Sequence, residues 1–92
     1  MNRHEIDLED YENIIHIAED EWRTELEEKG KHIFVSSHEI LGTLTEEYSE
    51  FKIAVQSNDI EEIEKELKDV LVIALHGLAS IRSNKMDWPK KK

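Results

Sequence analysis

The sequence contains no cysteine, one proline, three glycines and no apolar run longer than the six residues from Val70 to Leu75. Without cysteine, the chain has neither disulfide bonds nor a thiolate metal site. The scarcity of proline and glycine favours long helices that are joined by short connections. The apolar run is far below the roughly 18 residues of a membrane-spanning helix, so we expect no membrane contact.

Positive charge is also scarce, because 12 Lys and Arg residues face 22 Asp and Glu residues, for a net charge of −10. This charge disfavours nucleic acid as a partner. The acidic N-terminus is not typical of a signal peptide, and together with the lack of cysteine it leads us to expect a cytoplasmic protein. We expect one domain over residues 1–92, with flexible ends at 1–6 and 86–92.

Three stretches carry the caps and the apolar spacing of α-helices. Given by N-cap and approximate last residue, the expected helices run from Asp7 to Lys29, from Ser36 to Gln56 and from Asp59 to Ser83. Glu39 and Glu62 stand three residues after the second and third caps, which is the spacing of a capping box. The second and third helices should form an antiparallel hairpin, because only a short break separates them.

Each helix also shows an apolar stripe. The stripe of the second helix comprises Leu41, Leu44, Tyr48, Phe51 and Val55, and that of the third comprises Ile60, Ile63, Leu67, Val70, Leu71, Ala74, Leu78 and Ile81. Val72 and Ile73 make the third helix apolar on more than one side, so it needs covering from several directions. We therefore predict an all-α antiparallel bundle of three main helices per chain, completed by a homodimer or tetramer.

Pairs of acids occupy the flank of the second and third stripes. Glu47 and Glu50 are three residues apart, as are Glu66 and Asp69, so each pair shares one face of its helix. Packed antiparallel, the two helices could direct four carboxylates at one point. Crowded carboxylates repel one another unless a cation neutralises them, and oxygen ligands suit Mg²⁺, Mn²⁺ or Ca²⁺ rather than zinc.

The first helix is acidic almost throughout, with eleven acids between Glu5 and Glu28 and one base, Arg23. Most of these acids are expected to form a solvated face. Three of them could lend an outer carboxylate to a metal site: Glu21, Glu25 and Glu28.

The five histidines argue against another kind of metal site. None of them has an acid three residues before it, so the Glu-x-x-His pattern of ferritin-like di-iron bundles is missing. The sequence therefore excludes a di-iron oxidase of that type.

The segment from Leu44 to Phe51, Leu-Thr-Glu-Glu-Tyr-Ser-Glu-Phe, followed by Glu-Leu-Lys-Asp from Glu66 to Asp69, resembles the MazG-type all-α nucleoside triphosphate pyrophosphatases. The resemblance covers residues from about 36 to 83. It implies an enzyme that cleaves a nucleoside or deoxynucleoside triphosphate between the α and β phosphates, with Mg²⁺ as cofactor and Mn²⁺ as a possible substitute. It also implies metal ligands at Glu47, Glu50, Glu66 and Asp69, with Glu47 or Glu50 acting on the attacking water.

The chain departs from this family at the expected phosphate contacts. Family members often carry Lys or Arg shortly before the doubled Glu, where this chain has Gly42, Thr43 and Thr45, and the nearest upstream bases are Lys29 and Lys31. The candidates for phosphate binding are Lys52, Lys68, Arg82 and Lys85. Two alternatives stay open at this point, a phosphoribosyl-ATP pyrophosphohydrolase and a catalytically inactive helical interaction module.

Overall fold

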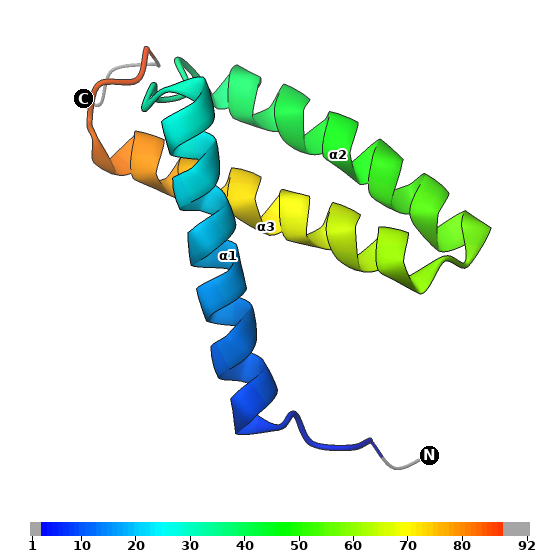
Figure 1. Cartoon of the computed structure of the whole chain (residues 1–92). Helices are drawn as coiled ribbons and strands as arrows, with labels where there is room; N and C mark the ends of the chain where they lie inside the picture. Colours follow the sequence, from blue (N-terminus) through cyan, green and yellow to red (C-terminus); the bar gives the residue numbers. More distant parts are fainter. Residues whose placement is uncertain (1–2, 88–92) are drawn as a thin grey trace.

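The computed structural model describes residues 3–87 and contains three α-helices and no strand within that range (Figure 1). These are α1 (Leu8–Lys29), α2 (Ser37–Ser57) and α3 (Ile60–Arg82). The all-α prediction is confirmed. No helix in the described range is both long and apolar enough to cross a lipid bilayer.

The predicted caps fix the start of every helix. The Asp7 side chain accepts a hydrogen bond from Glu9 N, the Ser36 side chain accepts one from Glu39 N, and Asp59 caps α3 in the same way. The capping box of α2 differs in one detail, because the Glu39 carboxylate accepts from Val35 N at 2.7 Å, one residue before the cap. The last residues, Ser57 and Arg82, lie one position from the predicted ones.

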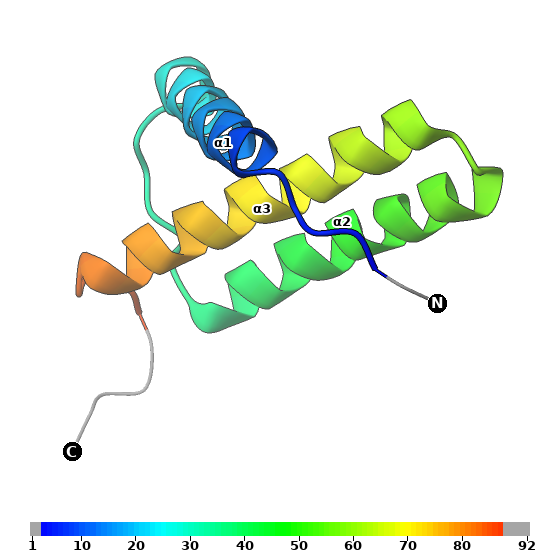
Figure 2. The ribbon, with the colours of Figure 1, turned by 90° about the horizontal axis from the view of Figure 1, so that it is seen from below.

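A tight turn joins α2 to α3. Asn58 ends α2 in the left-handed conformation with φ 61°, which Asn tolerates better than most residues, and its N–H donates to Val55 O. Asp59 then caps α3, so two residues reverse the chain. The result is the predicted antiparallel hairpin of α2 and α3, and α1 crosses α3 without comparable contact with α2 (Figures 1 and 2).

The connector between α1 and α2 is held to the C-terminal half of α3. Ser80 is fully buried, and its hydroxyl accepts from Phe34 N at 2.9 Å and donates to His76 O at 2.8 Å. Gly77 lets α2 approach closely, since a Cβ there would meet Ile40 Cγ2 at 3.4 Å. Met86 is buried and Asp87 N–H donates to Val35 O, so these two residues contact the fold; the flexible ends expected at 1–6 and 86–92 stay a prediction. The remainder of that end, residues 88–92, and residues 1–2 lie outside the described range.

The apolar core of the single chain is small. The buried apolar residues among residues 3–87 are Ala18, Ala54, Val72 and Met86. Much of the predicted α3 stripe is exposed, namely Ile60, Leu67, Leu71, Leu78 and Ile81. The apolar surface of α3 is wider than one neighbouring helix can cover, and α2 packs on the flank that carries Glu66 and Gly77 instead. Within the single chain, α1 and α2 therefore cover only part of the predicted stripe.

Candidate metal centre

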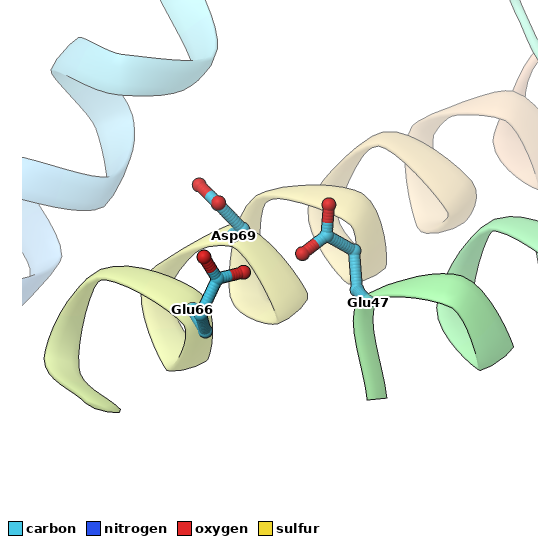
Figure 3. Close-up of side chains that lie close together, drawn as sticks. All are labelled: Glu47, Glu66 and Asp69. Carbon is cyan, nitrogen blue, oxygen red and sulfur yellow. The ribbon is translucent and has the colours of Figure 1, made fainter. Parts of the chain in front are cut away.

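Three of the four predicted acids converge between α2 and α3. Glu47 on α2 and Glu66 and Asp69 on α3 each place one carboxylate oxygen so that all three lie within 4.8 Å of one another (Figure 3). The i, i+3 spacing sets Glu66 and Asp69 on one face of α3, and the hairpin brings Glu47 opposite them. The local pattern and the turn together therefore build this cluster.

Two of these carboxylates are buried without sufficient partners. Glu66 is only 8% exposed, although it is a charged residue. One oxygen of Glu66 and one of Glu47, Oε2 in each case, find no hydrogen-bond partner among residues 3–87. An unpaired buried carboxylate oxygen is costly, so this arrangement calls for a cation or a proton.

The electrostatics of the cluster point the same way. Burial, followed by the charges of Glu50 and Asp69, raises the pKa of Glu47 from its ordinary 4.5 to about 7. Burial and the charge of Glu66 also raise the pKa of Asp69, and Lys65 opposes that shift only in part. Because the neighbouring acids disfavour the ionisation of Glu47 and Asp69, the cluster attracts positive charge.

Helix α1 adds further acids to the same place. The charges of Glu21 and Glu25 contribute to the raised pKa of Asp69, which places both near the cluster. The Glu21 carboxylate also forms an ion pair with Lys68 Nζ at 3.0 Å, and this ion pair links α1 to α3. Of the three outer carboxylates expected from α1, Glu21 and Glu25 approach the cluster, whereas Glu28 is exposed and does not contribute to these shifts.

A second tie between α1 and α3 lies beside the acids. Trp22 Nε1 donates to His76 Nδ1 at 3.0 Å, and His76 Nε2 lies 2.8 Å from the carbonyl oxygen of His32, which can only accept. His76 is therefore the neutral tautomer with its proton on Nε2, and the Phe34 ring packs edge-on against it with centroids 5.0 Å apart. These contacts hold the Trp22, Phe34 and His76 rings together beside the acid cluster.

The fourth predicted acid stands apart from the trio. Glu50 is exposed and lines a separate shallow cavity of about 230 Å³ with Glu66 and Ala54. Its charge still raises the pKa of Glu47, so it remains close to the cluster. The structure thus places Glu50 next to Glu47 but outside the group of three acids whose oxygens all lie within 4.8 Å of one another.

The predicted phosphate-binding residues are scattered. Lys52 is exposed and, at about 100° per residue, lies roughly 140° round α2 from Glu47. Lys68 is occupied by Glu21. Arg82 and Lys85 are exposed, and Arg82 lies 13 residues beyond Asp69, about 20 Å along the helix axis. Phosphate binding by these four residues stays a prediction that the geometry does not favour.

Lys29 lies at the site, although it was not among the residues predicted from the sequence to bind phosphate. It lines one cleft of about 150 Å³ together with Glu25, Glu47, Asp69 and Ile73. Its Nζ lies 3.3 Å from Glu25 Oε1, so it is held at the edge of the acids from the last turn of α1. The signal in the sequence was its place in Lys29-Gly30-Lys31, the nearest basic group upstream of the doubled Glu, and the crossing of α1 over α3 sets the position of Lys29.

The donor set fits a hard divalent cation. All ligand atoms in the cluster are carboxylate oxygens, which Mg²⁺, Mn²⁺ and Ca²⁺ prefer, and neither a thiolate nor an imidazole belongs to it. An antiparallel helical hairpin that joins carboxylates from facing helices defines the class of all-α proteins with an acidic metal centre.

Comparison with known families agrees with this class. The family model of the MazG nucleotide pyrophosphohydrolase domain matches residues 35–88, more than half of the 92-residue chain, including all three clustered acids. The chain belongs to this family, and the resemblance read from the sequence is confirmed. No curated protein and no solved structure matches the chain significantly.

Proposed function

We propose that this protein is a Mg²⁺-dependent nucleotide pyrophosphohydrolase that cleaves a nucleoside or deoxynucleoside triphosphate to a monophosphate and pyrophosphate. The observation that carries the proposal is the convergence of Glu47, Glu66 and Asp69 with two buried oxygens that lack partners. Membership of the MazG family supports the general activity.

Glu47, Glu66 and Asp69 would hold the ion, with Mn²⁺ as a possible substitute for Mg²⁺. Bound there, a divalent ion supplies charge neutralisation to the phosphates and makes water a better nucleophile. Glu66 is the most buried of the three, so it anchors the ion on the α3 side. Glu21 and Glu25 add negative charge around Asp69 and strengthen the attraction for the ion.

Glu50 would be the residue that orients the attacking water and accepts its proton. It lies close enough to Glu47 to influence its ionisation, yet it is exposed and outside the trio. A carboxylate that is not engaged with the ion can orient water and accept its proton. The sequence left Glu47 and Glu50 as equal candidates, and this separation favours Glu50 for the proton and Glu47 for the metal.

Lys29 and an adjoining cavity would receive the rest of the nucleotide. The cavity has a volume of about 250 Å³, its aromatic lining is Trp22, Phe34 and His76, and it shares Lys29 with the acid cleft. Lys29 would contact the phosphates, and the nucleotide ring would pack against the aromatic side chains. Both His76 nitrogens are already engaged, so His76 would contribute packing rather than hydrogen bonds to a bound base.

The test is pyrophosphate release from a panel of ribo- and deoxynucleoside triphosphates and phosphoribosyl-ATP, with Mg²⁺ or Mn²⁺. We expect metal-dependent release by the wild type, loss in Asp69→Asn, and retention in Asp20→Asn, which makes the same change at an exposed site of α1. Release from phosphoribosyl-ATP alone would move the substrate to that compound. No release from any compound by a folded, metal-binding protein would overturn the proposal in favour of an inactive module.

A further inference from the structure

One imidazole ring holds the chain on both sides of Lys29. Trp22, seven residues before Lys29, donates its indole N–H to His76 Nδ1 at 3.0 Å. The carbonyl oxygen of His32, three residues after Lys29, lies 2.8 Å from His76 Nε2, which donates to it. Helix α1 ends at Lys29 and Gly30 follows with φ 90°, so the end of the helix lies between these two contacts.

The Trp22 contact sets which face of α1 meets α3. Trp22, Glu25 and Lys29 are three and four residues apart, so they share one face of the helix. Glu25 and Lys29 line the acid cleft. Lys29 lies about 10 Å further along the helix than Trp22, so a rotation or displacement of α1 at Trp22 would carry Lys29 away from the acids.

The ion pair of Lys29 does not hold it at the acid cleft. The Lys29 and Glu25 side chains are 73% and 39% exposed, and their contact at 3.3 Å joins two residues of the same helix. Such an exposed pair contributes little stability and does not fasten one helix to another. A further ion pair joins Glu21 of α1 to Lys68 of α3, but it lies eight residues before Lys29. In the described part of the chain, the polar contacts that fasten the end of α1 to α3 are therefore those of His76.

The chemistry of this link requires a neutral imidazole. An indole N–H can only donate and a carbonyl oxygen can only accept, so the two contacts need one bare nitrogen and one N–H on the same ring. The His76 ring also packs edge-on against Phe34 and Trp22, with centroids 5.0 and 6.1 Å apart. Phenylalanine at position 76 would keep an aromatic ring for this packing and would lose both hydrogen bonds.

We propose that His76 is a positioning residue of the nucleotide site, which holds the end of α1 on α3 and thereby keeps Lys29 at the acid cleft. Its effect on the phosphates is exerted through Trp22, His32 and the segment between them. The consequence for nucleotide binding rests on the proposed function, whereas the ordering of the end of α1 by His76 does not.

The first test is a double-variant cycle with His76→Phe and Lys29→Met. For the nucleotide that the substrate panel identifies, we expect each single variant to raise KM roughly tenfold. The double variant should raise KM no further, because both changes remove the same contact. All three variants should keep the wild-type kcat and the Mg²⁺-induced rise in melting temperature. His16→Phe, the same change at an exposed site of α1, should alter none of these quantities.

The second test needs no turnover. Backbone order and amide hydrogen exchange are measured by NMR on ¹⁵N-labelled, metal-free wild type, His76→Phe and His16→Phe. We expect His76→Phe to lose order and exchange protection at residues 26–32 and to keep both at the turn between α2 and α3. The indole proton of Trp22, assigned by its absence from Trp22→Phe, should exchange faster in His76→Phe than in the wild type.

Each outcome supports or overturns the proposal. An unchanged KM in His76→Phe, or a KM that rises about 100-fold in the double variant, would show that His76 does not act through Lys29. Unchanged order at residues 26–32 in His76→Phe would overturn the proposal as well. A wild type without turnover defeats the proposed function alone, and the order measurement then decides the role of His76. Should His76→Phe fail to fold, Trp22→Phe replaces it in the cycle and the order measurement, because it removes only the indole donor.

Discussion

The two sides of the α2/α3 hairpin are formed by the same two helices and differ in nearly every physical respect. One side brings Glu47, Glu66 and Asp69 within 4.8 Å of one another, with buried oxygens that lack partners. The other carries exposed aliphatic and aromatic side chains such as Leu67, Leu78 and Tyr48. On the first side, repulsion between the gathered carboxylates lowers the free energy of unfolding. On the second side, apolar surface is exposed to water and does not contribute to the stability of the single chain.

The contrast concerns the stability that a short chain needs in order to keep a buried acidic site. Only four apolar side chains in the range 3–87 are buried, and three of them are no larger than valine. A core of this size leaves little stability to offset carboxylate repulsion. Burial of exposed apolar side chains such as Leu67, Leu78 and Tyr48 would stabilise the fold further. These side chains lie away from the acid cluster, so covering them would leave the acids accessible.

Among the variants, Glu66→Gln should have the largest effect on the acid side of the hairpin. Without its charge the site loses an anionic ligand, and we expect metal-dependent turnover to fall at least about 100-fold, because even indirect ligand partners contribute 10- to 100-fold. The metal-free protein should melt at a higher temperature than the wild type, because repulsion with its neighbours is relieved. Turnover and melting temperature with and without Mg²⁺ measure both effects.

Glu64→Gln is the matched control, since it makes the same change at an exposed position of α3. It should change neither turnover nor the Mg²⁺-induced rise in melting temperature. If the two variants behave alike, the acid side has no special role and the cluster is only a solvated surface.

Lys29→Met should have a smaller and different effect. The variant keeps most of the side-chain length but removes the cation from the cleft that contains Glu47 and Asp69. We expect KM for the nucleotide to rise roughly tenfold, the typical contribution of a charged hydrogen bond, with metal binding retained. Steady-state kinetics beside Lys31→Met, an exposed neighbour, measure the effect, and an equal rise in both variants would remove Lys29 from the site.

The smallest expected effect is the pH dependence of stability. The folded state raises the pKa of Glu47 from 4.5 to about 7, so it holds that proton more tightly than the unfolded chain does. The stabilisation is complete below about pH 4.5 and is lost as the pH rises through about 7. Asp69 shifts in the same direction.

Metal-free protein should therefore melt progressively lower as the pH rises across this window, and saturating Mg²⁺ should reduce the loss. Glu47→Gln should flatten the metal-free curve, as measured by thermal denaturation in a buffer series. A wild-type curve without Mg²⁺ that rises through the window would contradict the assigned shift.

Local signals account for the parts that the sequence predicted well. Asp7, Ser36 and Asp59 start the three helices because a cap needs only its own side chain and the backbone of the next turn. Glu66 and Asp69 share a face because helical spacing alone dictates it. The match to the MazG family spans residues 35–88, which include the caps of α2 and α3 and both acid pairs.

Tertiary structure decided which of these residues meet. The sequence treated Glu50 as equal to Glu47 and did not assign Lys29 to the site, because the packing of α2 on α3 and the crossing of α1 set those distances. It predicted an apolar stripe along α3 but not which part of it the chain itself covers, and α2 and α1 leave Leu67 and Leu78 in water. Caps and spacing act within one helix, so the sequence alone determined the helices and their faces; burial depends on what packs against each face, which only the assembled fold determines.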